Sequence, residues 1–488
     1  MSEAVQALFL KPPLAGACRN VVRDFLYGCW CNGRRIGGTQ MPPLNDLYAA
    51  THARGDGVET VLLDAGSEPR RYSELAGQRF AGVEAVAVLS STHSFKQDVE
   101  CLRSIKAANP AVRTIVYGAH PTFMPQYCLR EESIDFIVLR EPEETIRCLL
   151  HALAHGETVE DLEGIGYRTN TGEPRINAGR PLLDLDTLAL PDRTLLPRDV
   201  VYFNPVVKRM PYTTMQTSRG CPGRCIYCTA PTFYGNKYRF RSVALVLEEL
   251  RRVRQLGYRE VFFRDETFTA HRRRTVEICE GMLAGRLDLT WIANARVDTV
   301  DRELLTLLKH AGCHLLKFGV ETGDAGVLHA YGKGTSAEQA EEALRVAREV
   351  GLATHAHIIF GGPGETPETV DRTIAFIKRC APTTASFGIV TPYPGTELFE
   401  KVARVRPEIA DGSAADLEHL HTQGFFNEAI CGLTSGELSQ AVVRAYRQFY
   451  LRPAYLLRRL CSRRSWRELG IQALGGLNVM SFALTGRK

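Results

Sequence analysis

The sequence predicts an α/β protein in which a doubly wound parallel sheet is followed by a partial (β/α)6 barrel and a helical C-terminal region. Two observations support this fold class. Short β-branched runs alternate with helical periodicity over the first 155 residues, and the same alternation starts again near residue 211 with six strand–helix units. From about residue 398 the pattern is helical. We therefore expect domains at residues 1–155, 211–397 and 398–488, with a linker at 156–210.

The first domain is predicted to be Rossmann-like, because its strands and helices alternate. In such sheets a ligand binds at the carboxyl ends of the strands. The predicted strands are 4–10, 60–63, 83–89, 114–117 and 134–139, and the predicted helices are 44–54, 95–108 and 143–154. The linker is rich in Gly, Pro and Asp and includes a predicted hairpin at 164–177.

The second series of elements predicts a TIM-like barrel with its site at the C-terminal ends of the strands. The predicted strands are 213–217, 260–264, 289–294, 314–320, 354–360 and 385–390, with clear helical patterns at 243–256 and 337–350.

Composition excludes several classes of protein. Hydrophobic residues make up 44% and charged residues 24% of the 488 residues, so the chain is neither disordered nor fibrous. A net charge of +5 is small for this length, and we expect no nucleic-acid partner. The N-terminus has an acid and no basic segment before its apolar stretch, which favours a strand over a signal peptide. We therefore expect a cytoplasmic protein whose 14 cysteines are reduced thiols or metal ligands.

The C-terminal region is basic. Residues 444–488 contain ten Lys or Arg and a single acid, Glu468, and include an uncharged stretch at 469–484. The first interpretation is a helix packed on the barrel with a solvated basic face. The alternative is a peripheral contact with a membrane or a lipophilic substrate, because basic amphipathic helices lie on anionic lipid.

Three cysteines, Cys221, Cys225 and Cys228, form a CxxxCxxC motif directly after the first predicted barrel strand. A closed structural zinc site needs four protein ligands, usually in two pairs, and no partner pair is present. Thiolates are the ligands that iron–sulfur clusters require. Three thiolates on a four-iron cubane leave one iron open, so a small molecule is expected to bind and react there.

The motif, its position after the first strand and the aromatic Tyr227 before the last cysteine resemble the radical S-adenosylmethionine (radical SAM) superfamily. The resemblance covers roughly residues 205–395. It implies a [4Fe–4S] cluster held by the three cysteines, SAM chelating the open iron, and a 5′-deoxyadenosyl radical formed by reductive cleavage of SAM.

The same resemblance assigns SAM contacts after successive strands. Asp265 and Glu266 stand where the superfamily binds the SAM ammonium, and the alternative is a helix N-cap. Arg296 is assigned to the SAM carboxylate, with a surface ion pair as the alternative. Glu321 is assigned to the ribose or methionine, and a barrel ion pair is its alternative.

Two further elements complete the implied SAM site. Gly361 and Gly362, followed by Gly364, resemble the glycine-rich segment that approaches the adenine edge. Tyr227 would pack on the adenine, unless it is a plain core residue.

A Rossmann-like domain before such a barrel resembles the cobalamin-binding radical SAM subclass, which includes the anaerobic magnesium-protoporphyrin cyclases and the class B methylases. The lower-ligand motif DxHxxG is missing: its nearest match has Ala50 in the Asp position, and we interpret His52 as a histidine at a helix end. Cobalamin contacts are expected at the strand ends; the candidates are Ser90, Ser91, Thr92, Gly118, His120, Thr122 and Glu141. The alternative is a domain that binds no cobalamin and shapes the substrate pocket.

Cys29 and Cys31 form a CxC motif in a glycine-rich segment. We interpret it as a flexible loop near the active site. The alternative is a second cluster that also uses Cys18.

The function implied by the resemblance is methylation of an unactivated carbon of a small molecule, a tetrapyrrole or another biosynthetic intermediate. One SAM would methylate cobalamin and a second would supply the radical, with electrons from a flavodoxin or ferredoxin type of donor. The alternatives are an oxidative cyclase or rearrangement enzyme without methyl transfer, a tRNA methylthiotransferase, and a non-catalytic cobalamin or iron–sulfur carrier.

Overall fold

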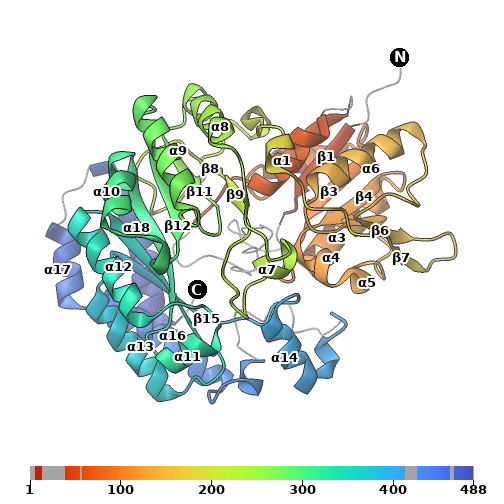
Figure 1. Ribbon diagram of the computed structural model, residues 1–488. Helices are drawn as coiled ribbons and strands as arrows, with labels where there is room; N and C mark the ends of the chain where they lie inside the picture. Colours follow the sequence, from red (N-terminus) through yellow and green to blue (C-terminus); the bar gives the residue numbers. More distant parts are fainter. Residues whose placement is uncertain (1–5, 14–38, 55–57, 413–425, 462–465, 487–488) are drawn as a thin grey trace. The chain divides into compact units, whose positions relative to one another are not determined.

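A computed structural model describes residues 6–13, 39–54, 58–412, 426–461 and 466–486. The chain forms two compact units, which are coloured from red to blue along the sequence in Figure 1. The first unit contains the described residues 6–13, Gln40–Val201 and 406–412, and the second contains Tyr202–Val405 and the described residues after 425. Each unit is described separately below.

The first unit is built on a seven-stranded sheet in the order β2-β1-β3-β4-β5-β6-β7. The first five strands of this order are parallel, and the last two are antiparallel. The strands are β1 (Gln6–Lys11), β2 (Glu59–Asp64), β3 (Ala85–Leu89), β4 (Arg113–Tyr117), β5 (Phe136–Val138), β6 (Ile165–Arg168) and β7 (Pro174–Ile176). Nearly every residue of the central strands β1 and β3 is buried, as expected of a sheet covered on both faces.

Helices lie on both faces of this sheet. Alternate residues of β1, such as Leu8 and Leu10, enter one apolar core together with residues of α3 and partly buried residues of α2. On the other face α1 packs against α6. The helices are α1 (Leu44–Ala53), α2 (Pro69–Gly77), α3 (Phe95–Ala108), α4 (Ala119–Phe123), α5 (Pro125–Cys128) and α6 (Glu143–His155). The doubly wound fold predicted from the sequence is therefore confirmed.

The segment predicted as a linker contributes to this unit. Its hairpin forms β6 and β7: β6 pairs antiparallel with β5, and β7 pairs antiparallel with β6. Residues up to Val201 belong to the first unit, so the division of the chain follows the hairpin and lies near the end of the expected linker. The hairpin belongs to the first unit because the hydrogen bonds between β6 and β5 join it to the sheet.

The second unit contains a six-stranded parallel sheet in the order β15-β14-β13-β12-β11-β8. Its strands are β8 (Tyr212–Met215), β11 (Glu260–Phe263), β12 (Thr290–Ala295), β13 (Cys313–Glu321), β14 (Ala353–Phe360) and β15 (Thr384–Ile389). This sheet confirms the six predicted strands of the barrel. A short antiparallel ribbon, β9 (Ser218–Arg219) with β10 (Arg239–Phe240), was not predicted. In the sequence, its two strands stand before and after the cysteine motif.

Helices cover one face of the six-stranded sheet (Figure 1). The helices of this unit are α7 (Ala230–Phe233), α8 (Val243–Gln255), α9 (Arg272–Ala284), α10 (Arg302–His310), α11 (Ala325–Ala330), α12 (Ala337–Val350), α13 (Pro367–Cys380), α14 (Glu397–Val405), α16 (Ser435–Tyr450), α17 (Pro453–Cys461) and α18 (Trp466–Thr485). The apolar residues of the covered face alternate with polar residues that point to the opposite, inner face.

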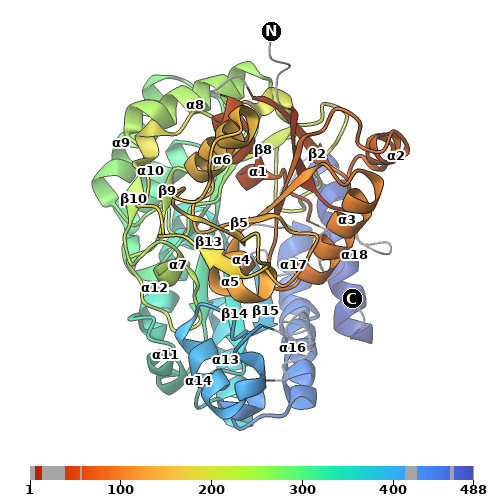
Figure 2. The same ribbon diagram turned by 90° about the vertical axis from the view of Figure 1, so that its right-hand side faces the viewer.

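The C-terminal helices belong to the second unit, and α16 and α18 lie side by side (Figure 2). Tyr446 of α16 contacts Phe482 of α18, with ring centroids 5.1 Å apart, and both enter the apolar core of the sheet. The packed helix expected from the sequence is thus present. Within the described residues, no helix is long and apolar enough to cross a membrane.

Gly118, directly after β4, has a φ of +115°, and a Cβ there would lie 2.5 Å from the carbonyl oxygen of Ser90. We predict that Gly118→Ala destabilises the first unit by about 1–3 kcal/mol, because both the backbone conformation and the close approach require glycine. Loss of amide-exchange protection in β3 and β4 measures the effect. Gly77→Ala is the control: Gly77 ends a helix with open space around it, so this change should cost nothing. Equal protection in the two variants would contradict the prediction.

Candidate active site

The three cysteines of the motif lie in the segment between β9 and α7, beyond the C-terminal end of β8. Cys221, Cys225 and Cys228 are free thiols and each is partly exposed. The Sγ of Cys221 lies 3.4 Å from the hydroxyl of Thr267, and the Gly223 amide lies 3.4 Å from the same sulfur. We call residues 220–228 the cysteine loop.

Two glycines let the cysteine loop pack closely on its neighbours. Gly220 has a φ of +87°, and a Cβ there would lie 2.0 Å from the carbonyl oxygen of Lys237. A Cβ at Gly223 would lie 2.7 Å from Nη1 of Arg296. The loop conformation therefore excludes side chains at both positions.

The donor set fits an iron–sulfur cluster better than a single metal ion. Among the residues that the structure describes, no three His, Cys, Asp or Glu side chains are placed to share one ion. A cubane takes each thiolate at a different iron, so it does not require the tight tetrahedral grouping of a zinc site. Three thiols in one short loop match the cluster.

Two cations lie near one of the thiols, that of Cys225. Burial raises the pKa of the Cys225 and Cys228 thiols, whereas Lys333 and Arg296 oppose this rise at Cys225. Thiols must lose their protons to bind a metal. The two cations therefore stabilise the thiolate form that the cluster needs.

A buried ion pair lies next to the cysteine loop. Nζ of Lys333 donates to Oε1 of Glu321 at 2.7 Å, and the two side chains are only 6% and 10% exposed. Glu321 ends β13 with a φ of +69°, which a residue with a side chain rarely adopts. A Cβ at Gly319 would lie 2.3 Å from the Glu321 carboxylate, so glycine is needed there to admit the pair.

Arg296 connects this ion pair to the cysteine loop. Its Nη2 donates to the carbonyl oxygen of Lys333 at 2.9 Å, and it forms a two-pronged pair with Asp298 at 2.9 and 2.8 Å. Its Nη1 is buried and has no hydrogen-bond acceptor among the described residues. A charged donor is thus left next to the cysteines, and it would bind an anionic group.

Asp265 and Glu266 are placed differently, although the sequence assigns them one role. The Asp265 carboxylate is fully buried and accepts hydrogen bonds from the Thr217 amide at 2.6 Å and the Ser218 hydroxyl at 2.7 Å. These hydrogen bonds fix the backbone segment that directly follows β8. Glu266 is half-buried and accepts from the Gly220 amide at 3.0 Å, and burial raises its pKa to about 8. Of the two, Glu266 borders the cysteine loop.

The glycine-rich segment after β14 packs against an aromatic pair. A Cβ at Gly362 would lie 2.1 Å from the ring of Tyr331, and Tyr331 meets Tyr227 edge-on with ring centroids 5.1 Å apart. The Gly361 amide donates to the buried Glu365 at 3.1 Å, and its carbonyl oxygen accepts from Asn427 at 2.8 Å. Tyr227 and this segment thus both pack against Tyr331.

The cobalamin candidates of the first unit gather at the carboxyl ends of β3 and β4. Nδ1 of His120 lies 3.3 Å from the hydroxyl of Thr92, and the hydroxyl of Thr122 donates to the carbonyl oxygen of Gly118 at 2.6 Å. The buried Ser90 Oγ and His120 Nε2 have no hydrogen-bond partner among the described residues. Buried polar atoms without partners are costly in a protein, so a polar ligand fits this edge.

The other candidates of this unit are held within the protein. Ser91 and Ser94 share a hydrogen bond of 3.1 Å between their hydroxyls, and Glu141 accepts from the Leu183 amide at 3.1 Å. His52 lies in the last turn of α1, with Nε2 3.0 Å from Glu144, as expected of a histidine at a helix end. Burial lowers the pKa of His120 to about 3, so its ring is neutral.

Sequence reasoning missed Lys333 and Glu365. Lys333 stands between Gly332 and Gly334, both with positive φ, in the segment YGKG. A lysine between two glycines in a loop after a barrel strand was the signal available. Cys29 and Cys31 lie outside the described residues.

The comparisons agree with this geometry. The chain matches the radical SAM superfamily over residues 215–377 and a B12 binding domain over residues 37–150. It is 32% identical over 431 residues to an uncharacterized methyltransferase of Pyrococcus horikoshii, covering 87% of this chain and 91% of that protein. It is 29% identical over 436 residues to the anaerobic magnesium-protoporphyrin IX monomethyl ester cyclase of Rubrivivax gelatinosus, covering 87% and 76%.

Two solved structures share the fold. The methyltransferase TsrM from Kitasatospora setae, determined with cobalamin and a [4Fe–4S] cluster, matches with a TM-score of 0.69 and 17% identity over 98% of this chain and 97% of that one. The cobalamin-dependent radical enzyme OxsB, determined with aqua-cobalamin and S-adenosylmethionine, matches with a TM-score of 0.70 and 17% identity over 100% and 74%.

A parallel β/α sheet with a three-thiol loop at its C-terminal end defines an iron–sulfur enzyme. The sequence relatives make this more specific: the chain belongs to the radical SAM superfamily, in the group that also carries a B12 binding domain. Its cofactors are therefore a [4Fe–4S] cluster, SAM and cobalamin.

Breaking the buried pair should be costly. We predict that Lys333→Gln lowers the free energy of unfolding of the second unit by about 3–5 kcal/mol, because Glu321 would keep its charge without a partner. The double variant Glu321→Gln, Lys333→Gln should recover most of the loss. Urea unfolding of the wild type, Glu321→Gln, Lys333→Gln and the double variant measures this coupling. In contrast, Arg273→Gln breaks an exposed pair with Glu277 and should cost less than about 1 kcal/mol. An uncoupled, additive result for the double variant would refute a stabilising pair.

The raised pKa of Glu365 predicts that the free energy of unfolding depends on pH. Burial raises its pKa from 4.5 to about 7, so the folded protein favours the protonated form. The free energy of unfolding should therefore fall as pH rises from about 5 to 8, and Glu365→Gln should flatten this slope. Glu368→Gln is the control, because the pKa of the exposed Glu368 is lowered by Thr366 and titrates below this range. The midpoints of urea unfolding at pH 5 and pH 8 are compared for the wild type and both variants. An unchanged pH dependence in Glu365→Gln would contradict a raised pKa of Glu365.

Proposed function

We propose that this enzyme methylates an unactivated carbon of a small-molecule biosynthetic intermediate, such as a tetrapyrrole or another natural-product precursor. One observation supports this above the others. The cysteine loop follows the first strand of a radical SAM sheet, and the same chain also contains a B12 binding domain. Bound together, the cofactors supply a carbon-centred radical and a methyl group. The chain's residues must bind them and exclude water.

We assign the residues of the second unit as follows. Cys221, Cys225 and Cys228 hold the cluster. Arg296 binds the SAM carboxylate, since its buried Nη1 is a charged donor next to the cysteine loop. Glu266 accepts from the SAM ammonium, whose positive charge would lower the raised pKa of this carboxyl group.

Three more positions complete the proposed SAM site. Gly361 and Gly362 offer backbone atoms to the adenine edge, and Tyr227 packs on the ring. Glu321 contacts the ribose or methionine while Lys333 holds it in place. Asp265 acts as a positioning residue through Thr217 and Ser218, because its carboxylate is fully buried.

In the first unit we propose that Ser90 and His120 contact the corrin, because their buried polar atoms have no hydrogen-bond partner among the described residues. Ser91, Thr92, Gly118, Thr122 and Glu141 shape the same edge. We propose no histidine as lower ligand, since His52 pairs with Glu144.

The proposed partners are a small-molecule substrate and an external electron donor of flavodoxin or ferredoxin type. The thiols that form the cluster favour a reducing compartment such as the cytoplasm. For the basic C-terminus we favour packing within the second unit over membrane contact, because Phe482 and Ala483 are buried in its core.

A second function, oxidative cyclisation or rearrangement without methyl transfer, is supported by the 29% identity to the magnesium-protoporphyrin cyclase of Rubrivivax gelatinosus. A methylthiotransferase with a β-barrel for RNA is less favoured, because the described residues after 426 form helices and no strand.

Anaerobic reconstitution with iron, sulfide and cobalamin, followed by addition of SAM and a chemical one-electron reductant, tests the proposal. We predict one four-iron cluster and one corrin per chain, 5′-deoxyadenosine and S-adenosylhomocysteine as products, and retention of label from methyl-labelled SAM with the bound corrin. Alanine at Cys221, Cys225 or Cys228 should abolish cluster assembly and SAM cleavage, whereas Cys148→Ala, in the first unit, should not. Deoxyadenosine without retained label would favour the cyclase. Full cluster assembly in any of the three variants would exclude the proposed site.

A further inference from the structure

Residues 427–432, which we call the 427–432 segment, bring the C-terminal region to the glycine-rich loop after β14. The segment begins with a short 3-10 helix, Asn427–Ala429, and leads to α16, which packs beside β14 and β15 (Figure 2). It belongs to the same compact unit as the six-stranded sheet. It lies outside residues 215–377, the part of the chain that matches the radical SAM superfamily.

The side chain of Asn427 bridges the ends of two strands. Its Nδ2 donates to the carbonyl oxygen of Gly361, after β14, and to that of Val390, after β15, both at 2.8 Å. The side chain is fully buried. Because both partners can only accept a hydrogen bond, the nitrogen of the side-chain amide must face them.

The bridge stands where the pairing of the two strands ends. Paired residues of β14 and β15 run up to Phe360 and Ile389, and the Val390 amide donates to the Phe360 carbonyl oxygen at 2.7 Å. The carbonyl groups of Gly361 and Val390 lie one residue further on, and both accept from Asn427. One side chain therefore sets the separation of the two chain segments just beyond the sheet.

The backbone of the 427–432 segment holds Asn427 in place. The Ile430 amide donates to the Asn427 carbonyl oxygen at 2.9 Å, and the Gly432 amide donates to the carbonyl oxygen of Glu365 at 3.0 Å. The Glu365 carboxylate in turn accepts from the Gly361 amide at 3.1 Å. Hydrogen bonds thus join the segment to both ends of the glycine-rich loop.

An apolar contact joins the segment to the surroundings of the cysteine loop. Ile430 packs against a buried cluster that contains Tyr331, Val390 and Ile226, and Tyr227 packs against the same cluster. Ile226 and Tyr227 both belong to the cysteine loop. The 427–432 segment therefore contacts the cluster that the cysteine loop also enters.

Gly361 is required for the close approach of Asn427. It has a φ of +91°, and a Cβ there would lie 2.9 Å from Nδ2 of Asn427 and 3.0 Å from the side chain of Leu438. Both the backbone conformation and the space therefore exclude a side chain at this position. The loop and the C-terminal region fit together only with glycine at this point.

The bridge leaves one polar atom of Asn427 unpaired. Its Oδ1 is buried and has no hydrogen-bond partner among the described residues. A buried polar atom without a partner costs free energy. Departures of this kind are expected at functional sites, where a local rule is broken for a role other than stability. The unpaired oxygen therefore indicates that the bridge serves more than packing.

We propose that Asn427 is a positioning residue for SAM. By bridging Gly361 and Val390, it holds the glycine-rich loop in the place where the adenine of SAM lies against it. Asn427 acts through this loop, because it bonds to the backbone that carries the contact. A loop that is ordered beforehand loses less conformational entropy on binding, so the bridge raises the affinity for SAM. The inference rests on the proposed contact of Gly361 and Gly362 with the adenine.

Equilibrium dialysis with labelled SAM tests this role. The protein is reconstituted with iron, sulfide and cobalamin and is not reduced, and cluster absorbance shows whether each variant is folded. We expect Asn427→Ala and Asn427→Asp to raise the dissociation constant of SAM by about fivefold or more. The aspartate keeps the size of the side chain and an acceptor but removes both donors. After reduction, KM for SAM in deoxyadenosine formation should rise likewise, whereas kcat should change less than about threefold.

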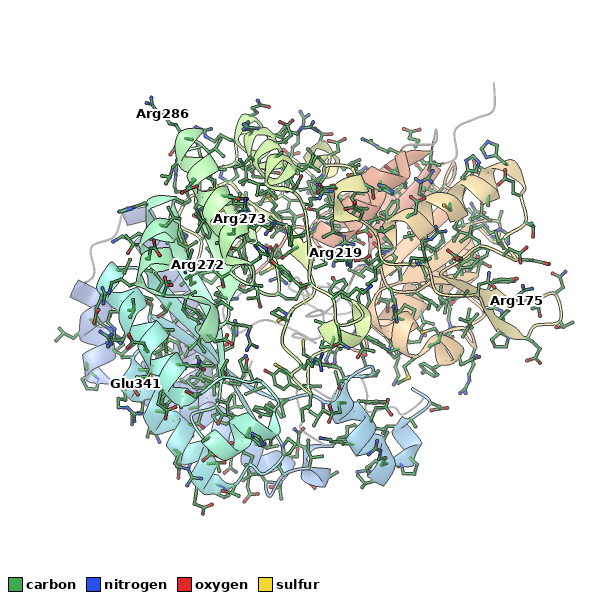
Figure 3. All side chains as sticks on the ribbon, in the orientation of Figure 1. Arg175, Arg219, Arg272, Arg273, Arg286 and Glu341 are labelled. Carbon is green, nitrogen blue, oxygen red and sulfur yellow. The ribbon has the colours of Figure 1, made fainter. Side chains whose placement is uncertain are left out.

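Tyr450→Phe is the matched control. The Tyr450 hydroxyl bonds to the amide and the carbonyl oxygen of Ala385, at 3.0 and 2.6 Å, near the amino-terminal end of β15. Its loss also removes two hydrogen bonds between a buried side chain and the sheet backbone. The urea midpoint should therefore fall, but SAM affinity should stay within about twofold of the wild type. Arg286→Gln removes an exposed charge that points away from the unit (Figure 3) and should change neither.

Amide exchange of the wild-type protein tests the proposal even if a variant fails to fold. Coupling between two sites is reciprocal, so SAM should slow exchange in peptides that cover the 427–432 segment. Unchanged exchange in this segment, wild-type SAM affinity in either Asn427 variant, or an equal loss of affinity in Tyr450→Phe would overturn the proposal. Weaker SAM binding in the Asn427 variants, together with a wild type that retains no methyl label, would support the positioning role and contradict only the proposed methylation.

Discussion

The buried pair between Lys333 and Glu321 is the interaction on which the rest of the candidate site depends. The Lys333 carbonyl oxygen accepts from Arg296, and the Tyr331 carbonyl oxygen accepts from the Ile226 amide within the cysteine loop at 3.0 Å. The short loop that follows α11 therefore contacts the cysteine loop, Arg296 and Glu321. Because a buried charge without a partner is costly, this loop cannot shift without loss of stability.

The charged groups on the inner face of the six-stranded sheet differ between the amino-terminal end, the middle and the carboxyl end of its strands. Glu260 is enclosed by amides and His314 at the amino-terminal end, and a neutralised pair closes the carboxyl end. In the middle, Arg264 and Lys317 lie beside Phe262. The apolar residues alternate with these and face the helices. The period of two along each strand thus separates a packing face, which gives stability, from a chemical face, which gives function.

Much of the fold and part of the site could be predicted from sequence. The strands and the three cysteines were predicted because β-branched runs and close cysteine spacing are local signals. The separate roles of Asp265 and Glu266 were not, since adjacent carboxylates differ only in what tertiary structure places around them. Lys333 was missed for the same reason: its partner lies twelve residues away in the chain.

The sequence by itself determined the class of enzyme, the order of the two β/α units and the three cysteines proposed as cluster ligands, because each depends on patterns within a few residues. Tertiary structure decided which hairpin joins the first sheet, which charges are paired, and that Asn427 bridges the ends of β14 and β15. These outcomes depend on strand register and burial, which bring distant residues together and set the free energy of each charge.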